Sequence, residues 1–519
     1  MSRVDRLLAG TVVAAALAFG WSGLTAGYEG PYDEGNTLCA ATRVLAGETP
    51  YRDFWLLHPP GTTWLLAGAF RVFGATLGVE RAVKVVVVAL TAALVFLLAR
   101  RAARPLAAAA AALLFVVLPT QTLSLRSRDT GLVLVLATLL AACRPSASPR
   151  RRALVAGLLA GFTVFFKQDF VLAAALGGAV AVALAAATRA SPGRRARTGD
   201  GWKTIFEEGL LPFAAGLVAG PALLAATLAA HGTFAEFLRQ AILFPATSFG
   251  RFRSLPLSLR FEQLGAAFGP GISSKGVLDA GAVPVLFLVA CTAAFVAIGR
   301  GGWLVWRRSE GAGRESDSLP ALFASSMACL LLLAAPFQRA DLEHLNAATA
   351  LALVVLPALP APAMGMAAVA LVSFASWPGA RGVTVPPDLL ETARFVAANS
   401  APGERIFVGN ARHDRLAYSA PLLYFLSGRT GATRYDNLHP GVATTRPVQE
   451  EIVRSLEARG TRWAVLWDGP PPVEPNQSSM SSGVLVLDEW LAGHGREAAR
   501  FGSYRVLELT PPTTLPRAR

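Results

Sequence analysis

The residues best able to do chemistry in this sequence are gathered in one polar stretch close to its N-terminus. The stretch holds two groups separated by a predicted helix, Tyr28-Glu29-Gly30-Pro31-Tyr32-Asp33-Glu34-Gly35 and Pro50-Tyr51-Arg52-Asp53-Phe54-Trp55-Leu56-Leu57-His58-Pro59-Pro60-Gly61. Ionisable residues next to apolar segments cost energy to hold near lipid, so these are the first candidates for function. The simpler interpretation is that Asp33 and Glu34 cap the helix that begins near Asn36, because carboxylates favour helix N-termini.

Three further groups of polar residues follow predicted apolar segments. They are Arg126 and Arg128, then Lys167 with Gln168 and Asp169, then Arg339 with Asp341 and His344. Arginine and lysine side chains in such positions can hold an anionic group such as a phosphate. Each could instead bind lipid headgroups or pair with a neighbouring acid, as Arg128 with Asp129 or Lys167 with Asp169. The sequence leaves both interpretations open.

A metal site is not indicated by the spacing of the possible ligands. His58 and His344 are each isolated, and a lone histidine is more often a hydrogen-bonding structural residue than a ligand. The chain has neither a CxxC nor an HExxH motif, and its four cysteines do not suggest a disulfide framework. We therefore expect a function that requires no cofactor, although a divalent metal would be compatible with these residues.

The elements that position these residues are predicted from the composition, which is 53% hydrophobic and only 16% charged, with a mean hydropathy of +0.46. Such a chain belongs in a lipid bilayer, where a helix of about 20 residues crosses about 30 Å of hydrocarbon. About eleven apolar spans are predicted, near 7–27, 80–99, 105–121, 130–143, 153–167, 170–188, 208–230, 281–299, 319–336, 345–360 and 362–378. The first could pass for a signal peptide, but its apolar part is long for one, so we expect it to be retained.

The net charge of +14 and the pI of 10.4 are explained by where the basic residues lie. They cluster in every second loop, at residues 3–6, 100–104, 144–152, 189–203 and 300–314. This is the pattern of the positive-inside rule, so the charge predicts no nucleic-acid partner. With a cytoplasmic N-terminus, an odd number of spans places the C-terminus outside. We expect a multi-pass protein of the plasma (inner) membrane.

Two domains are predicted, a transmembrane domain at 1–382 and an extracytoplasmic C-terminal α/β domain at 383–519. The first domain has long external loops at 28–79 and 231–280, and the earlier loop carries two helical patterns, at 36–47 and 62–74, that suit the membrane surface. In the tail, helices at 387–399 and 448–459 alternate with strands at 405–409 and 462–467. A polar and aromatic stretch at 424–441 suits sugar recognition and equally suits a loop docked on the membrane domain.

The order of motifs in the first loop resembles that of the GT-C glycosyltransferases. An Asp33-Glu34 pair after the first span, a helix, Pro50-Tyr51-Arg52-Asp53 and then His58-Pro59-Pro60-Gly61 is similar to the family 39-like branch. That branch comprises dolichyl-phosphate-mannose protein mannosyltransferases and bacterial lipid A aminoarabinose transferases. The resemblance is sharpest over 28–75 and continues to about 380 as a pattern of hydropathy and loops. It implies an enzyme that moves a sugar, with inversion, from a polyprenyl-phosphate donor to an extracytoplasmic protein, lipid or glycan.

The resemblance also implies roles for individual residues. Asp33 corresponds to the general base of the family, with Glu34 as its neighbour. The departing lipid phosphate gains charge as the glycosidic bond breaks, so basic residues should line its exit. The residues expected to bind the donor phosphate are Arg128, Lys167 and Arg339, and those expected to contact substrate from the loops are His58, Arg52, Asp53, Gln168 and His344.

Other functions are compatible with a polytopic chain. A transporter or lipid flippase needs polar residues in mid-span and broken helices in matching halves, whereas here the charges fall mainly at the ends of the spans. A glycan ligase or polymerase would share the membrane, the lipid-linked donor and the external site. The expected partners are a polyprenyl-phosphate-linked sugar, membrane lipids and an acceptor that the sequence does not identify.

Overall fold

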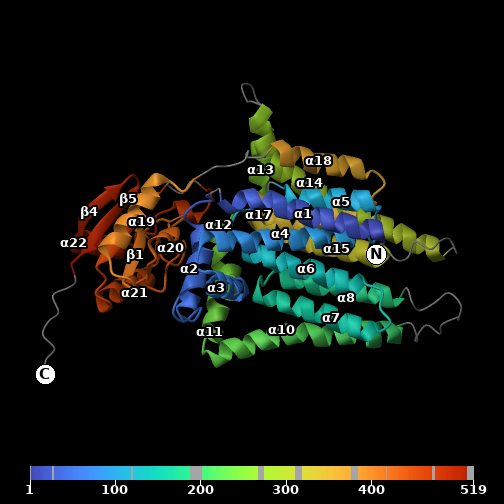
Figure 1. The fold of residues 1–519 in the computed structure, drawn as a ribbon, viewed down its shortest axis with the longest axis horizontal. Helices are drawn as coiled ribbons and strands as arrows, with labels where there is room; N and C mark the ends of the chain where they lie inside the picture. Colours follow the sequence, from blue (N-terminus) through green and yellow to red (C-terminus); the bar gives the residue numbers. More distant parts are fainter. Residues whose placement is uncertain are drawn as a thin grey trace.

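Helices form most of the protein, and a small sheet lies at one end of them (Figure 1). The structure is a computed structural model that describes residues 2–25, 28–118, 121–187, 202–266, 274–309, 318–375, 384–416, 418–469 and 474–510. Each predicted apolar span corresponds to a helix in these ranges. The helices are α1 (Arg3–Thr25), α4 (Leu77–Ala99), α5 (Pro105–Val116), α6 (Ser127–Cys143), α7 (Pro149–Phe162), α8 (Phe170–Ala187), α10 (Leu211–Ala230), α14 (Ser274–Ser309), α15 (Leu319–Leu332), α17 (Leu342–Val355) and α18 (Pro362–Ala375).

The helical bundle has the length and the surface expected in a membrane. Among the described residues, five helical segments are long and apolar enough to cross a bilayer, namely Arg3–Trp21, Leu77–Ala99, Phe170–Ala187, Trp202–Ala230 and Ala280–Leu304. Large apolar side chains on different helices point outward, with Leu106 74% exposed, Val218 64%, Phe295 63% and Leu371 60%. Water would penalise this surface, whereas lipid would not. The chain is a multi-pass membrane protein, as its composition predicted.

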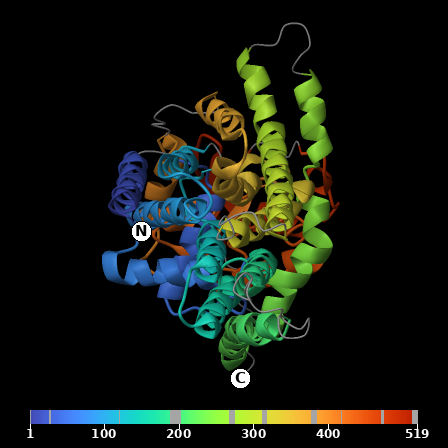
Figure 2. The same ribbon diagram turned by 90° about the vertical axis from the view of Figure 1, so that its right-hand side faces the viewer.

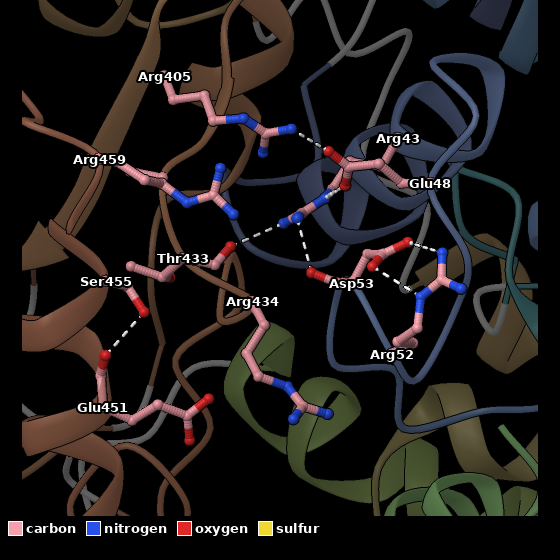
Figure 3. A pocket seen from close by; sticks show the side chains of 11 residues that line it. Arg43, Glu48, Arg52, Asp53, Arg405, Thr433, Arg434, Glu451, Ser455 and Arg459 are labelled. Atoms are coloured by element: carbon pink, nitrogen blue, oxygen red, sulfur yellow. Dashed lines mark hydrogen bonds and ion pairs between the residues drawn. The ribbon is translucent and has the colours of Figure 1, made fainter. Parts of the chain in front are cut away.

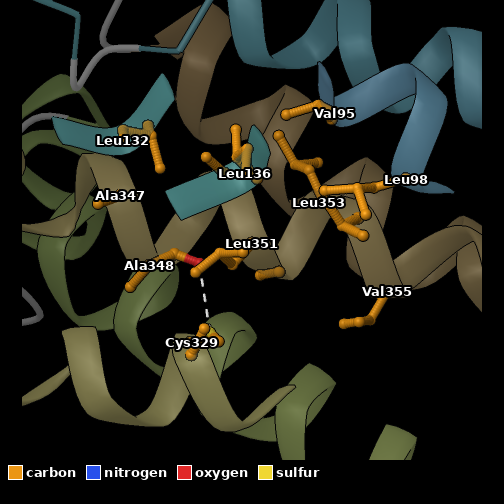
Figure 4. Packing of buried hydrophobic residues seen from close by; sticks show 14 of the residues in the cluster. Val95, Leu98, Leu132, Leu136, Cys329, Ala347, Ala348, Leu351, Leu353 and Val355 are labelled. Atoms are coloured by element: carbon orange, nitrogen blue, oxygen red, sulfur yellow. Dashed lines mark hydrogen bonds between the residues drawn. The ribbon is translucent and has the colours of Figure 1, made fainter. Parts of the chain in front are cut away.

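Helix α17 lies at the centre of the bundle. Its residues from Leu345 to Val355 are all buried, and its neighbours are α4, α5, α14 and α15. The close view shows Leu351 and Val355 of α17 among residues of the surrounding helices, with the Cys329 thiol donating to the Ala348 carbonyl over 3.3 Å (Figure 4). A helix that is apolar all round is buried on every side. Because other helices shield it from lipid, α17 can be shorter than a lone span.

The two ends of the bundle differ. The two long loops and the sheet lie at one end, and the N-terminus lies at the other (Figure 1). Arg100 pairs with Asp5 over 2.7 Å, which places the basic turn after α4 at the N-terminal end. Viewed end-on, α13 (Leu257–Ala266) and the start of α14 extend past the other helices at one edge (Figure 2).

The remaining helical elements of the loops are short. The first loop forms α2 (Asp33–Leu45) and α3 (Gly61–Phe73). A 3-10 turn at Thr163–Phe165 leads to α8, and a π-helix at Ile205–Leu210 leads to α10. Two short elements flank α17, namely α16 (Ala334–Gln338) and the 3-10 turn Leu356–Ala358. The second loop forms α11 (Phe234–Phe237), π-helices at Leu238–Leu243 and Pro245–Phe249, and α12 (Gly250–Arg253). The second loop is therefore largely helical up to α13, not an extended segment.

The C-terminal part contains a five-stranded mixed sheet of order β2-β1-β3-β5-β4. Strands β2 (Thr430–Gly431), β1 (Arg405–Asn410) and β3 (Trp463–Trp467) are parallel, and β5 (Tyr504–Leu509) and β4 (Gly495–Phe501) continue the sheet antiparallel. Its helices are α19 (Pro387–Asn399), α20 (Leu422–Ser427), α21 (Arg446–Ala458) and α22 (Val486–His494), with a 3-10 turn at Gln477–Ser479. The predicted α/β character is confirmed. The predicted boundary at 382–383 lies outside the described residues.

The first loop and the C-terminal part share one hydrophobic core. Leu38 of α2 and Phe70 of α3 belong to the same buried cluster as Leu389, Ile406 and Leu422. Helix α2 is thus covered by the C-terminal part, and the position of both loop helices along the membrane surface stays a prediction. Helix α3 keeps an exposed apolar side, with Val72 71% and Phe73 74% exposed. Because apolar side chains of both segments pack together, the first loop fixes the position of the sheet at this end of the bundle.

A buried ion pair stabilises the same junction. The Arg43 side chain is 3% exposed, and its Nη1 donates to both carboxylate oxygens of Asp436 over 2.8 and 2.9 Å and to the Thr433 carbonyl over 2.9 Å. Its Nη2 donates to the Asp53 carbonyl over 2.8 Å, and its Nε pairs with Glu48. Removing one partner of such a pair leaves a charge buried without compensation.

We expect Asp436→Asn to destabilise the docked C-terminal part by about 3–5 kcal/mol, since Arg43 would lose its main partner. The midpoint of thermal unfolding of the purified protein in detergent would measure the loss. The control is Glu497→Gln, which removes a carboxylate from an exposed pair with Arg500 on β4 and should change the midpoint little. Equal midpoints for the two variants would contradict the role of Arg43 and Asp436.

Candidate functional site

The loop that carries His58 is fixed by Tyr51. In the described residues Tyr51 is the one non-glycine residue with a positive φ, 70°, and its side chain is fully buried. Its hydroxyl donates to the His58 carbonyl over 2.7 Å, and its own carbonyl accepts from Gln240 Nε2 at 3.0 Å and Arg434 Nη2 at 2.6 Å. A strained backbone of this kind persists only where its surroundings hold it. Tyr51 therefore ties the His58 turn to the second loop and to the C-terminal part.

Two glycines allow the Lys167 segment to lie against His58-Pro59-Pro60-Gly61. A Cβ atom on Gly61 would lie 2.4 Å from the Phe165 carbonyl oxygen, and one on Gly131 of α6 would lie 2.9 Å from the Cβ of Lys167. Side chains at either position would push these elements apart. The glycine that ends the motif thus brings α3 against the turn that precedes Lys167.

Asp33 lies in the first turn of α2 and pairs with a residue of another element. Its carboxylate is 2.8 Å from Arg126 Nη1, and its side chain is 45% exposed. The N-cap residue of the helix is Tyr32, which makes no side-chain capping bond. The charge of Asp33 suits the helix N-terminus, but its direct partner is Arg126. A carboxylate that is paired on one side and open on the other can still meet a substrate.

Glu34 is in a different environment from Asp33. Its side chain is 2% exposed and pairs with Arg81 at the start of α4. Burial raises the pKa of Glu34, and the Arg81 charge opposes that shift only in part. Glu34 is thus closed to a substrate, and its contact with Arg81 fixes α2 over α4.

Glu29 completes the surroundings of Arg126. One of its oxygens is 2.9 Å from Arg126 Nη2, and its carboxylate accepts from the backbone N–H groups of Leu123 and Ser124 over 3.1 Å. Burial alone would raise the pKa of Glu29, but Arg126 and the bonds from Ser124 outweigh it and hold the pKa at about 2. Arg126 is therefore shared between two carboxylates. Sequence reasoning favoured Arg128, although both arginines had been noted.

His58 lies among the basic residues of three separate segments. Its pKa is lowered well below the usual value by burial first, and then by the charges of Lys167, His439, Arg128 and His344. Arg128 is 2.6 Å from Glu343, not paired with Asp129, and Lys167 is 3.2 Å from Asp169. The charges of Arg128, Lys167 and His344 thus act on His58, and the clustering of Arg128, Lys167 and Arg339 near Asp33 stays a prediction.

Several buried polar atoms around these residues lack a hydrogen-bond partner within the described part of the chain. They are Asn36 Oδ1, His58 Nδ1, Arg126 Nε, Arg128 Nε and Gln168 Oε1. Gln168 uses its other amide atom to donate to the Ala241 carbonyl over 2.9 Å. Buried polar groups are normally satisfied by protein, water or ligand. The atoms on His58, Arg128 and Gln168 therefore remain available to polar atoms of a ligand.

Arg339 is already engaged by protein groups. Its Nη1 and Nη2 donate to the two carboxylate oxygens of Glu474 over 2.9 and 2.6 Å, its Nε contacts Asp341 at 2.9 Å, and Nη1 also donates to the Arg253 carbonyl. A bidentate pair of this kind is among the strongest ionic contacts. Phosphate binding by Arg339 stays a prediction. Its observed role is to bind Glu474 of the C-terminal part.

His344 is oriented by an acid from its own helix N-terminus. Its Nδ1 lies 2.7 Å from Asp341, which also caps α17 by accepting from the His344 backbone N–H. Burial would raise the pKa of Asp341, but the contact with His344 and the charge of Arg339 lower it below its usual range. In the described residues, no group of three His, Cys, Asp or Glu side chains is placed to hold a metal ion.

The second loop and the tail supply residues that sequence reasoning did not assign. The Arg253 guanidinium lies over the rings of Tyr32 and Tyr418 at 5.1 and 4.8 Å, and donates to the Tyr32 hydroxyl over 2.6 Å. That hydroxyl is 3.2 Å from His439 Nδ1, and the His439 ring lies 4.6 Å from that of Trp55. Arg253 lies in a part of the second loop that is rich in aromatic and basic residues, which is its only signal in the sequence. The 424–441 stretch is docked on the first loop through these contacts.

Arg52 and Asp53 do not join the groups around Asp33 and His58. They pair with each other at 2.8 Å and line a separate cavity with Arg43 and Arg434 (Figure 3). Asp53 also accepts from the Thr49 backbone N–H over 2.7 Å, which closes the turn before Phe54. Their expected contact with substrate stays a prediction.

The comparisons with known proteins agree with this architecture. Residues 57–192 match the family described as dolichyl-phosphate-mannose-protein mannosyltransferase, and no curated protein matches the chain. ArnT from Cupriavidus metallidurans, bound to undecaprenyl phosphate or in the apo state, has a TM-score of 0.50 and 17% identity, covering 96% of this chain and 97% of that chain. The oligosaccharyltransferase AglB from Archaeoglobus fulgidus has a TM-score of 0.49 and 11% identity, covering 90% and 70%.

The likeness to ArnT extends from the bundle through the C-terminal sheet, since nearly the whole of both chains is covered. At this identity it shows a shared fold. The chain therefore has the GT-C fold, as the motifs of the first loop predicted. The family match begins at residue 57 and includes His58, Arg128 and Lys167, but not Asp33 or Arg339.

The contact between Glu474 and Arg339 predicts a pH dependence of stability. Burial would raise the pKa of Glu474, but Arg339 holds it at about 2, against an ordinary value of 4.5. A carboxylate with a depressed pKa stabilises the fold above its unfolded pKa and loses that effect as the pH falls through the folded value. The free energies of unfolding of wild type and Glu474→Gln should therefore differ most above pH 4.5, by at most roughly 3 kcal/mol. Their thermal midpoints, which report this difference, should converge toward pH 2.

The matched control for this series is Glu450→Gln, on the exposed face of α21 beside Arg446. It should follow wild type at every pH. A difference between wild type and Glu474→Gln that stays constant from pH 7 to pH 2 would show that the carboxylate charge is not what stabilises the junction.

Proposed function

We propose that this protein is a membrane glycosyltransferase that transfers a sugar, with inversion, from a polyprenyl-phosphate donor to an extracytoplasmic acceptor. The observation that supports it most is the position of Asp33, a half-exposed carboxylate held by Arg126 at the same end of the bundle as the basic cluster around His58. Asp33 can accept a proton, and the basic cluster can bind a phosphate. A single displacement at the anomeric carbon needs both.

The donor is inferred from two sources. Arg128 and Lys167 are 14% and 19% exposed, so their charges are partly shielded from water and act more strongly on an anion. The similar ArnT structure contains undecaprenyl phosphate, which is a lipid phosphate of the class proposed here. A monophosphate leaving group can be met by arginine and lysine alone, so no cofactor is proposed.

The proposed reaction uses this chain's residues as follows. Asp33 accepts the proton of the acceptor hydroxyl while the oxygen attacks the anomeric carbon of the donor sugar. The bond between that carbon and the phosphate oxygen breaks, and the phosphate leaves with the electron pair. Arg128 and Lys167 stabilise the negative charge that develops on the phosphate. Arg126 orients Asp33, and the Tyr32, Arg253 and His439 contacts hold the start of α2 in place.

The competing functions make different demands on the bundle. A transporter would place ionisable residues midway along its helices. Here the buried charges Glu80, Arg81 and Lys84 lie in the first turns of α4, and Asp129 lies in the first turn of α6, 2.6 Å from Lys84. A glycan ligase or polymerase stays a closer alternative, because it would use the same site. The acceptor separates it from a transferase of single sugars.

We also propose that the site faces away from the cytoplasm in the plasma (inner) membrane. The basic turn after α4 lies at the N-terminal end of the bundle, where Arg100 contacts Asp5, and positive loops favour the cytoplasmic side. The sheet and both long loops lie at the opposite end (Figure 1).

Cysteines introduced at Ser191 and Ser479 of a cysteine-free variant should be labelled from opposite sides of the membrane by an impermeant thiol reagent. Ser191 lies outside the described residues, within the predicted cytoplasmic loop, and Ser479 lies in the short 3-10 turn of the C-terminal part. Labelling of both from the same side would overturn the orientation and, with it, the extracytoplasmic acceptor.

Asp33→Asn should reduce turnover of a radiolabelled polyprenyl-phosphate sugar by roughly 10²- to 10⁴-fold, because the amide cannot take a proton. Its thermal midpoint should stay close to wild type, since Asp33 is half exposed and Arg126 keeps Glu29 as its partner. Membrane extracts would serve as the source of acceptor, at matched expression.

Two further variants show what each outcome means. Glu34→Gln would remove the buried carboxylate that contacts Arg81 Nη2, so its main effect should be on the thermal midpoint. Glu497→Gln, on the exposed edge of β4, controls for a lost surface carboxylate and should leave turnover unchanged. Near-wild-type turnover by Asp33→Asn would remove it as the base and leave Glu29, Glu34 and Asp53 as the acids of the loop.

A further inference from the structure

A second polar cavity lies between the first loop and the C-terminal part (Figure 3). It has a volume of about 480 Å³, within the range of small-ligand sites of about 300–1,000 Å³. Its walls come from the end of α2 and the following turn, from the segment after β2, and from α21. The residues that line it are Arg43, Glu48, Arg52, Asp53, Arg405, Ala432, Thr433, Arg434, Glu451, Ser455 and Arg459.

Arginines outnumber carboxylates among the residues that line this cavity. Five arginines face three carboxylates, and each carboxylate already has a protein partner. Glu48 pairs with both Arg43 and Arg405, Asp53 pairs with Arg52, and Glu451 accepts from the Tyr435 hydroxyl over 2.8 Å. Arg43 also pairs with Asp436, and Arg434 lies 3.9 Å from Glu236, so Arg459 is the arginine of this cavity that has no carboxylate partner among the described residues.

Two of the arginines keep unused donors. Arg434 Nε is buried without a hydrogen-bond partner among the described residues, and the nearest carboxylate to its Nη2 is that of Glu236 at 3.9 Å. Arg459 extends from the end of α21 toward the middle of the cavity (Figure 3), and no described carboxylate lies within ion-pair distance of it. Guanidinium groups match carboxylate and phosphate oxygens by geometry as well as charge.

The cavity is also held in shape before any ligand arrives. Arg43 is fixed by Asp436 and Glu48, and Arg405 donates from Nη1 to the Gly431 carbonyl over 2.8 Å. Walls that need no rearrangement bind a ligand at lower cost in conformational entropy.

We propose that this cavity binds an oxyanion, either a phosphate or a carboxylate, on a ligand that approaches from the same side as the C-terminal sheet. The cavity is distinct from the cluster around Asp33 and His58, since none of its lining residues belongs to that cluster. The two are joined through Tyr51, whose carbonyl accepts from Arg434 and whose hydroxyl donates to the His58 carbonyl. An anion that binds Arg434 would therefore contact a direct partner of Tyr51, the residue that fixes the His58 turn.

The test is binding of simple probes to the purified full-length protein in detergent, by titration calorimetry at low salt. The probes are inorganic phosphate, glucuronate and neutral glucose, so that the phosphate and carboxylate sources are separated. Saturable binding of phosphate or glucuronate, and none of glucose, is the expected result. Arg459→Gln should weaken that binding about tenfold or more, as the loss of a charge-assisted hydrogen bond predicts.

The matched control is Arg454→Gln, which removes the same charge from the exposed face of the same helix, outside the cavity. It should leave the affinity within about twofold, since exposed charges are screened. Equal weakening by Arg454→Gln and Arg459→Gln, or no saturable binding of either anion to wild type, would overturn the proposal. Asp33→Asn should bind the probe as wild type does, so this result is independent of the proposed transferase activity.

Discussion

Burying the guanidinium of Arg43 requires an acceptor for each of its N–H groups, and those acceptors come from distant parts of the chain. Glu48 and the Asp53 carbonyl belong to the first loop, and Asp436 and the Thr433 carbonyl belong to the C-terminal part. A charge at this depth would be costly without them. Because α2 carries both Arg43 and Asp33, the contacts that satisfy one residue also set the position of the other.

The candidate site is built from the same kind of long-range dependence. Asp33 is held by Arg126, and Glu343 contacts Arg128 from the first turn of α17. Tyr51 connects the His58 turn to Gln240 and Arg434. The bundle thus supplies rigid helix ends, and the loops and sheet supply the side chains that join them. A carboxylate and a group of cations are held close, but most of the cations already pair with nearby acids.

The helices could be predicted from the sequence because a membrane leaves the backbone few alternatives, so a long apolar run is nearly sufficient evidence. The partners of the charged residues could not. Arg128 pairs with Glu343, and Asp129 pairs with Lys84, although Arg128 and Asp129 are adjacent in sequence. Two local pairs, Lys167 with Asp169 and Arg339 with Asp341, matched the simplest expectation of pairing with a neighbouring acid. Strands β4 and β5 were also missed, since β4 is a mostly exposed edge strand that shows little apolar alternation.

The junction between the first loop and the C-terminal part also has a consequence for how the protein is made. Arg43 and Asp436 are 393 residues apart. At a synthesis rate of about 5–20 residues per second, the loop waits roughly 20–80 seconds for its partner. During that time α2 has neither its ion pair nor the apolar cover of the sheet, so it must stay hydrated or in contact with lipid or a chaperone. The junction that positions α2 can therefore form only after Asp436 has been synthesised.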